Sequence, residues 1–339
     1  MIICVKDFLK ILIKKFFMKG EKMLDNRTFH GIIKELCKEL NIKMEIKSYG
    51  WILKLTKNNI TKYIVGNNFP LNSESSSIIV SDKYATYEML ESFGIPAVKH
   101  TILFNPSERG DYIPKEGNYS TVFSEFAKYG ALVVKPNVGF EGNGVTLCKT
   151  IKEVEIAIQN LFKTNSAICI CPYYKIEKEY RVFYLNGKAK LIYGKEKPVV
   201  IGDGISTLGQ LITKNHLPEK PVVTENLASL DLSMIPKDNQ IVELSWKHNL
   251  SGGATATVLE KASLEQEKLY KNIEELALKA GEATDVNFAT IDIIRTVDNR
   301  LYVMEINSGI STTIFANTVQ NGRELVKNVF RDALNEMFK

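Results

Sequence analysis

Cysteine is scarce in this chain and shows no pattern. The sequence contains five cysteines, an odd number: Cys4, Cys37, Cys148, Cys169 and Cys171. This scatter predicts reduced thiols and excludes the disulfide framework that holds many small secreted domains together. Cys169 and Cys171 lie two residues apart in an apolar segment, but no further cysteine or histidine set completes a zinc site. We therefore expect buried structural thiols.

A hydrophobic run long enough to span a membrane is also missing. Residues 1–17 are apolar with Lys6, Lys10, Lys14 and Lys15 at helical spacing, which is typical of an amphipathic helix on an anionic membrane surface. The segment is too short and too charged to cross a bilayer, and no small-residue cleavage site follows it. We favour the alternative, in which this segment is a helix packed on the body of the protein or an extension that precedes the folded domain. This interpretation predicts a cytoplasmic protein.

The chain lacks a strong charge of either sign, internal repeats and low-complexity tracts. A formal net charge of +5 is small for 339 residues, so we expect no nucleic-acid partner, although anionic substrates would be accepted. The content of 45% apolar and 24% charged residues is that of an ordinary globular protein. The length suffices for a large core and for two or three lobes.

Two apolar stretches near the C-terminal end carry the strongest chemical signal. Ala289–Arg295 and Leu301–Ser308 have strand length and are separated by turn residues, which predicts a β-hairpin. The hairpin would bring Asp292, Glu305 and Asn307 together, the last two on one face, because side chains two apart on a strand point the same way. Three oxygen ligands on rigid strands suit Mg²⁺ and leave positions open for phosphate oxygens. The alternative is a hairpin with solvated acids.

A second signal is a glycine-rich loop between two predicted strands. The first strand, from Ala131, delivers Lys135, and the second begins at Val145. The loop between them contains Gly139, Gly142 and Gly144, which would let backbone amides approach a phosphate closely. The order Gly-x-x-x-x-Gly-Lys-Ser/Thr is absent and a strand follows the glycines, so this is not a P-loop. Taken alone, a plain hairpin is the more frequent alternative.

Periodicity and turn residues predict the remaining layout. The expected helices are Thr28–Leu40, Lys83–Phe93, Ile151–Phe162 and Leu264–Ala280, and the expected strands are Trp51–Leu55, Lys62–Val65 and Ile168–Lys175. Ser81 or Asp82 would cap the helix that begins at Lys83. The segment Asn67–Ser77, rich in Asn and Ser, is predicted to be a linker.

Five motifs, in order, resemble those of ATP-grasp carboxylate-amine ligases, including the ATP-grasp part of cyanophycin synthetase and the glutathione-forming and D-alanine:D-alanine ligases. They are Ser81–Pro96, Val134–Pro136 with the glycine loop, Ile201–Ile212, Asn249–Gly253, and the triplet Asp292, Glu305 and Asn307. The resemblance covers roughly residues 80 to 310. It implies an α+β protein with the ATP-grasp fold, in which two α/β lobes clamp ATP. We expect an N-terminal domain with the amphipathic extension (1–80), a middle lid lobe (81–166) and a C-terminal lobe with the metal site (167–339).

The resemblance also implies roles in ATP binding. Lys135 and Lys83 would hold the phosphates, and the amides of Gly139, Gly142 and Gly144 would close over them. The hinge around Tyr173 and Lys175 would meet the adenine edge through its backbone, and Glu179 would hydrogen-bond the ribose. Relatives usually carry a glutamate at the start of this hinge, where Cys171 or Pro172 stands here.

Catalysis would depend on cations placed where charge develops. Mg²⁺, or Mn²⁺ as an alternative, would sit on Asp292, Glu305 and Asn307. Arg181 is the candidate for stabilising the acyl phosphate and the oxyanion that follows, and its alternative role is a surface ion pair with Glu179.

The resemblance also implies residues that would select the substrates. Lys247, Asn249 and the turn Ser251–Gly253 offer donors for a substrate carboxylate or amine, and Lys195 and Lys197 supply further basic groups. The loop positions Phe140, Glu141 and Asn143 and the segment Gly309–Thr313 depart from the resembling enzymes. The departure in the segment after the metal ligands indicates a different acceptor pocket, and the loop positions, which lack the basic residues of the cyanophycin type, argue against cyanophycin chemistry itself.

We therefore predict an ADP-forming ligase that activates an amino-acid or peptide carboxylate as an acyl phosphate and joins it to an amine. Homo-oligomers are common among the resembling enzymes, so a homo-oligomer is included in the prediction. The alternatives are a small-molecule kinase, a non-catalytic ATP-binding module and a membrane-surface protein.

Overall fold

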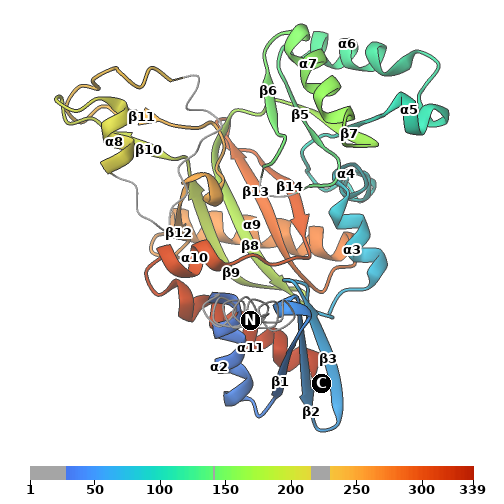
Figure 1. Ribbon diagram of the computed structural model, residues 1–339, viewed down its shortest axis with the longest axis vertical. Coiled ribbons are helices and arrows are strands. Elements are labelled where there is room, and N and C mark those ends of the chain that lie inside the picture. The colour runs from blue at the N-terminus through green and yellow to red at the C-terminus, as the bar shows by residue number, and fades with distance from the viewer. Residues whose placement is uncertain (1–27, 140–141, 215–229) are drawn as a thin grey trace, which may run out of the picture. The chain divides into compact units, whose positions relative to one another are not determined.

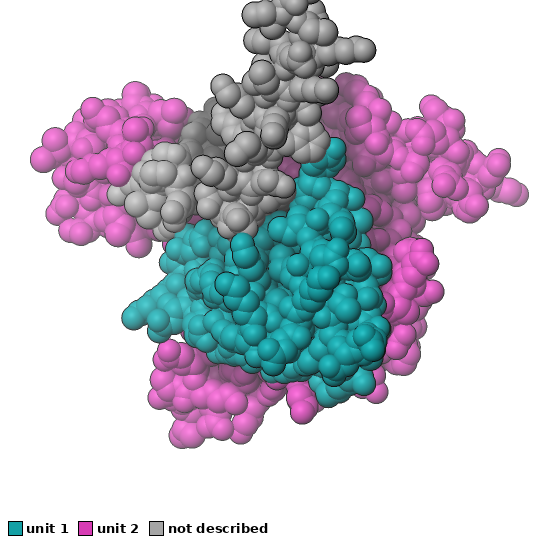
Figure 2. Space-filling view, turned by 60° about the horizontal axis from the view of Figure 1, so that its bottom comes forward, with its two compact units in different colours: residues 1–71, 309–339 teal, residues 72–308 magenta. Residues whose placement is uncertain are grey.

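The computed structural model describes residues 28–139, 142–214 and 230–339. The chain divides into two units, residues 1–71 with 309–339 and residues 72–308, coloured teal and magenta in Figure 2. The predicted amphipathic segment 1–17, Cys4, Phe140 and Glu141 lie outside the described residues. The predicted lobe boundaries after residues 80 and 166 stay a prediction.

The first unit combines the two ends of the described chain. Its elements are α2 (Thr28–Glu39), β1 (Lys43–Lys47), the 3₁₀ turn η1 (Ser48–Gly50), β2 (Ile52–Lys57), β3 (Ile60–Val65), α10 (Thr313–Thr318) and α11 (Gly322–Met337). The strands form an antiparallel sheet in the order β1-β2-β3. Helix α2 is amphipathic and buries Ile32, Ile33 and Leu36 completely, which explains why the periodicity predicted it.

The second unit contains a four-stranded antiparallel sheet in the order β4-β7-β5-β6 (Figure 1). Its strands are β4 (Thr101–Phe104), β5 (Leu132–Pro136), β6 (Thr146–Cys148) and β7 (Ala167–Pro172). The associated helices are α5 (Pro106–Arg109), η2 (Gly110–Tyr112), α6 (Gly117–Tyr129) and α7 (Ile151–Phe162). Helices α3 (Glu74–Ser81) and α4 (Lys83–Ser92) instead contact β14 (Leu301–Asn307) of the larger sheet. Helix α7 starts with a capping box between Thr150 and Glu153, and α6 and α7 contribute Val122, Val154 and Ala157 to the core of this sheet.

A five-stranded antiparallel sheet in the order β12-β9-β8-β13-β14 forms the larger part of the second unit. Its strands are β8 (Ile176–Leu185), β9 (Lys188–Glu196), β12 (Thr255–Val258), β13 (Phe288–Thr296) and β14 (Leu301–Asn307). Helix α9 (Leu264–Ala283) covers one face with Ile273, Ala277 and Ala280. Alternation along the strands leaves the opposite face for polar side chains.

Smaller elements lie between these strands in sequence: β10 (Val199–Ile201), α8 (Leu208–Lys214), β11 (Ile241–Glu243) and η4 (Leu250–Gly252). Strands β10 and β11 pair antiparallel, and Val200, Leu208 and Leu211 form a separate small core. No described helix combines the length and the hydrophobicity needed to cross a bilayer.

The α+β class and most expected elements are confirmed, and the differences have physical reasons. Part of the predicted linker Asn67–Ser77 is helical, because Ser73 caps α3 by accepting from the Ser76 backbone N–H at 3.0 Å. Strand β1 was not predicted, since its residues Lys-Met-Glu-Ile-Lys are mostly polar and lie at a sheet edge. Asp82, and not Ser81, caps α4. Cys37, Cys148, Cys169 and Cys171 are free and buried, as expected.

Candidate active site

The centre of the polar sheet face is a buried ion pair between Arg181 on β8 and Asp292 on β13. The two residues are direct cross-strand neighbours, and both hydrogen bonds are short: Arg181 Nε to Asp292 Oδ1 at 2.7 Å and Nη2 to Oδ2 at 2.6 Å. Burial alone would raise the pKa of Asp292, but Arg181 and then Lys195 outweigh it and lower that pKa to about 2. The alternative partner predicted for Arg181, Glu179, is not the group that holds its guanidinium.

A second buried pair lies beside the first. The Lys195 ammonium on β9 contacts Glu179 on β8, its cross-strand neighbour, and lies 3.4 Å from Asp292 Oδ2. Burial raises the pKa of Glu179 to about 7, against the opposing effect of Lys195. Two cations and two carboxylates therefore share one network from which water is largely excluded, and removal of any one would leave a buried charge unbalanced.

The three candidate metal ligands lie next to one another on β13 and β14. Asp292 pairs directly with Glu305 across the strands, and the Asn307 amide donates to Glu305 Oε1 at 3.3 Å. Glu305 and Asn307 are partly accessible, whereas Asp292 is 1% exposed. Two carboxylates and an amide oxygen are a donor set that fits Mg²⁺. No cluster of three His, Cys, Asp or Glu side chains suited to a metal occurs in the described part of the chain, so a metal ion bound here would also need the Asn307 oxygen and oxygens of a bound substrate.

The start of the glycine loop is tied to the N-terminus of helix α4. Asn137 Oδ1 accepts from the Tyr84 backbone N–H at 3.1 Å, and its amide donates to Asp82 Oδ2 at 2.6 Å. The Lys83 ammonium donates to the Gly139 carbonyl at 2.9 Å. A lysine at a helix N-terminus beside a glycine loop is a suitable anion site.

Lys83 also connects the loop electrostatically with the sheet. Burial lowers the pKa of Lys83, Glu305 acts in the opposite direction, and Lys135 lowers it further. Lys135 is 7% exposed and pairs with Cys169 in the register of β5 and β7. The two candidate phosphate lysines and a candidate metal ligand therefore influence one another directly.

The rest of the loop meets the candidate substrate residues. Gly142 and Gly144 have positive φ angles of 71° and 70°, which glycine tolerates best. The Lys247 ammonium donates to the Gly142 carbonyl at 3.2 Å, and a Cβ on Gly142 would lie 3.3 Å from Asn249 Nδ2. Lys247 and Asn249 thus lie against the glycine loop, which is the segment predicted to bind phosphate.

An apolar cluster of residues from both sheets adjoins the loop and the hinge. Its buried members are Val98, Val133, Cys171 and Ile294, and Tyr173, Trp246 and Met304 are among the residues packed on it. Apolar surroundings of this kind suit a nucleotide base. The Tyr173 backbone N–H already donates to Ala131 and the Lys175 carbonyl accepts from Val297, so a base would use other backbone groups of the hinge. The Lys175 side chain itself is exposed.

Sequence reasoning missed two buried histidines near these groups. His100 is 2% exposed and lies within electrostatic range of Lys135 and Lys83, and His248 is 4% exposed and lies near Lys195 and Lys197. One ring nitrogen of each, His100 Nε2 and His248 Nδ1, has no hydrogen-bond partner among the described residues. A single histidine outside a motif gives no signal in one sequence, so neither could have been found that way.

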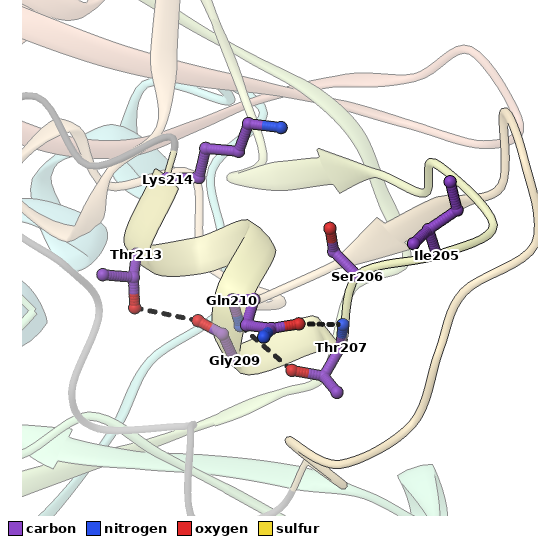
Figure 3. Close-up of a pocket in the computed structure, with 7 residues that line it drawn as sticks. All are labelled: Ile205, Ser206, Thr207, Gly209, Gln210, Thr213 and Lys214. Atoms are coloured by element: carbon purple, nitrogen blue, oxygen red, sulfur yellow. Dashed lines mark hydrogen bonds between the residues drawn. The ribbon is translucent and has the colours of Figure 1, made fainter.

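A surface hollow over helix α8 is a different feature (Figure 3). It is lined by Ile205, Ser206, Thr207, Gly209, Gln210, Thr213 and Lys214. The Thr207 N–H donates to Gln210 Oε1 at 2.9 Å and the Gln210 N–H donates to Thr207 Oγ1 at 3.2 Å. These groups cap the helix, and none of the candidate site residues lines the hollow, so its location gives no reason to assign it catalytic chemistry.

This arrangement of two antiparallel sheets, a glycine loop and a carboxylate hairpin defines the class of protein: the chain has the ATP-grasp fold, and the predicted likeness is confirmed. A protein-family model described as a RimK-like ATP-grasp domain matches residues 219–328. The structure of a bifunctional glutathione synthetase from Pasteurella multocida superposes with a TM-score of 0.56 at 17% identity, covering 91% of this chain and 45% of the other. A D-alanine–D-alanine ligase from Bacillus anthracis gives 0.50 at 18% identity, covering 79% and 71%.

Curated relatives are similar at the sequence level. Cyanophycin synthetase from Trichormus variabilis is 25% identical over 236 residues, 64% of this chain and 24% of the relative. A glutathione biosynthesis bifunctional protein from Streptococcus agalactiae is 24% identical over 302 residues, 82% of this chain and 38% of the relative. The chain therefore spans well under half of the length of these relatives.

Proposed function

We propose that the protein is an ATP-dependent carboxylate-amine ligase that activates an amino-acid or peptide carboxylate as an acyl phosphate and joins it to an amine. The observation that carries the proposal is the convergence of Lys83 on the glycine loop with Glu305 of the carboxylate hairpin. A phosphate-binding loop and a metal-ligand set that meet at one place are what phosphoryl transfer requires. The relatives named above support the reaction class.

In the first step, an oxygen of the substrate carboxylate would attack the γ-phosphorus of ATP, and the bond to the ADP oxygen would break. Lys83 and Lys135 would neutralise the phosphate oxygens, and the amides around Gly142 and Gly144 would hold them. Asp292, Glu305 and Asn307 would hold Mg²⁺, which supplies positive charge to the phosphates when bound. We propose that Mn²⁺ can substitute at the same oxygen donors.

In the second step, the amine nitrogen would attack the carbonyl carbon, and phosphate would leave with the electron pair of its bond to that carbon. The amine would lose a proton, and an amide would remain. Arg181 is proposed to stabilise the oxyanion, which requires its guanidinium to share its donors between Asp292 and the substrate. Lys247 and Asn249 would position one substrate against the glycine loop.

The assay that tests the proposal is ADP release from Mg-ATP with pooled amino acids and short peptides. Each pool is also examined by mass spectrometry for a product one water lighter than the sum of two reactants. We expect ADP release that depends on the pool, together with such a product. A stable phosphorylated compound without condensation would instead establish the kinase alternative, and nucleotide binding without turnover would indicate a binding module.

The Glu305→Gln variant tests the metal assignment. We expect ADP formation to fall by at least about a hundredfold, because the amide is a weaker ligand for Mg²⁺ and carries no charge. The unfolding midpoint should stay close to that of the wild type, since Glu305 is partly accessible. Glu265→Gln, an exposed substitution in the first turn of α9, is the matched control and should retain full turnover. Undiminished turnover in Glu305→Gln would refute the assignment.

Three further properties belong to the proposal. We propose a cytoplasmic location, amino acids or peptides as the substrates, and a homo-oligomeric state. Size-exclusion chromatography with light scattering tests the last of these directly.

A further inference from the structure

His100 is a buried histidine for which the proposed reaction as described has no use. It lies just before β4, two residues after Val98, and is 2% exposed. Its Nδ1 lies 2.8 Å from the Val98 carbonyl oxygen. A carbonyl can only accept, so Nδ1 carries the proton, and in the neutral ring Nε2 is a lone pair.

This lone pair has no partner among the described residues. A buried acceptor left without a donor is unfavourable, and native proteins almost always supply one. Burial, followed by the positive charges of Lys135 and Lys83, lowers the pKa of His100 well below its ordinary value. The ring therefore stays neutral, and Nε2 stays an acceptor that requires a donor from outside.

The position of His100 identifies what that donor can be. In the antiparallel register of β4 and β7, Thr101 pairs with Ile170, so position 100 comes next to Cys171 at the hinge. Val98 and Cys171 are both members of the apolar cluster proposed above for the base. The two lysines disfavour a cationic donor such as the ammonium group of an amino acid. Among the groups of ATP, the phosphates only accept and the ribose hydroxyls are proposed for Glu179, which leaves the exocyclic amine of adenine.

We propose that His100 Nε2 accepts a hydrogen bond from the exocyclic amine of adenine and is a residue that selects ATP against 6-oxopurine nucleotides. This inference rests on the proposed function, since it places the base of ATP in the apolar cluster. A 6-oxo group would present a second lone pair to Nε2.

The experiment is a direct binding measurement by isothermal titration calorimetry of the full chain, with Mg²⁺ and no second substrate. The probes are ATP, ITP, which has a 6-oxo group, and purine riboside triphosphate, which has neither an amine nor an oxo group. We expect the wild type to prefer ATP over ITP by roughly 10- to 100-fold, the value of one buried hydrogen bond. The affinity for purine riboside triphosphate should lie between those for ATP and ITP. This nucleotide cannot donate a hydrogen bond to His100 Nε2, but it also places no oxygen lone pair against that nitrogen.

His100→Leu should lose most of this preference, chiefly by binding ATP more weakly. His100→Gln keeps an acceptor on a side chain of similar length and should retain part of the preference. His30→Leu, a buried histidine of the other unit, is the matched control and should leave the ATP to ITP ratio unchanged. If His100→Leu fails to fold, the three nucleotides on the wild type and on His100→Gln still provide the test.

Equal affinity of the wild type for ATP and ITP would overturn the inference, and so would a preference that survives in His100→Leu. The failure of the proposed nucleotide site looks different, because neither ATP nor ITP would then bind the wild type. Tight ATP binding without turnover would refute the ligase reaction and leave the assignment of His100 intact.

Discussion

At the scale of single residues, Asp292 shows how a candidate metal ligand is held ready. Both of its carboxylate oxygens accept from Arg181, and Lys195 lies close to one of them. A buried carboxylate without such partners would be protonated or would destabilise the fold. The cations therefore keep Asp292 charged and oriented.

Replacing Arg181 by Met should reveal this dependence as a loss of stability. We expect the free energy of unfolding to fall by roughly 3–5 kcal/mol, because Asp292 would keep a buried charge with only Lys195 nearby. The double variant Arg181→Met with Asp292→Asn should recover part of the loss, since the charge is then removed as well. Urea unfolding of the two single variants and the double variant measures the coupling. Strict additivity would contradict the argument.

His248 should make the stability of the protein depend on pH. Burial, followed by Lys197 and Lys195, lowers the pKa of its imidazole from 6.5 to about 4. Below pH 6.5 the unfolded chain takes up a proton that the folded protein does not, so stability is complete above that pH and is lost as the pH falls toward 4. The contribution is up to about 1.4 kcal/mol per pH unit. The slope of unfolding free energy against pH should be smaller in His248→Gln, and equal slopes would refute the assignment.

Sequence reasoning placed the three candidate ligands together on the hairpin but did not identify their partners. Alternation along a strand is a local rule, so Glu305 and Asn307 could be placed on one face, with Asp292 on the adjacent strand. Arg181 and Asp292 are 111 residues apart, and no local rule connects them. The predicted alternative pair, Arg181 with Glu179, joins side chains two apart on one strand, which are farther apart than direct cross-strand neighbours.

At the scale of elements, helix α9 contains a glycine, Gly281, at which the helix does not end. The predicted end was Ala280, but α9 continues through Gly281 to Ala283. A Cβ at Gly281 would lie 2.4 Å from Cζ of the buried Tyr184 ring. The absence of a side chain at Gly281 therefore allows α9 to pack closely on β8. From the sequence alone, a glycine needed for close packing cannot be distinguished from a glycine that ends a helix.

Two glycine-to-alanine substitutions test this interpretation. Gly281→Ala should destabilise the protein by about 1–3 kcal/mol, because the ring of Tyr184 would have to move. Gly31→Ala in α2 is the matched variant: among the described residues, its new methyl group would meet only the end of the Arg323 side chain, at 3.7 Å. It should stabilise by up to about 1 kcal/mol through helix propensity. Chemical denaturation gives both values, and a stabilising Gly281→Ala would contradict the packing argument.

At the scale of the whole molecule, the first unit is assembled from segments far apart in the sequence. Helices α2 and α11 are joined by ion pairs such as Lys327 with Glu39 at 2.7 Å and Arg331 with Glu39 at 3.0 Å. The aromatic rings of Phe29, Phe69 and Phe330 pack together beneath them. The sequence predicted α2 well from its apolar stripe. It gave no indication that the last helix of the chain completes the core of the unit, because amphipathicity shows that a helix has a partner but not which one.

Phe330→Ala should therefore open both ends of the described chain together. Phe330 is fully buried, with ring centroids 5.4 Å from Phe29 and from Phe69, so we expect a loss of about 3–5 kcal/mol in the local stability of the unit. Hydrogen exchange followed by mass spectrometry should show faster exchange in α2 and in α11 to a similar extent, since one core supports both helices. Phe123→Ala is the matched control: this phenylalanine is 55% exposed, so the substitution should change stability by no more than about 0.5 kcal/mol. Continued protection of α2 while α11 exchanges would show that α2 is held by other contacts, and the first unit would then not be a single cooperative structure.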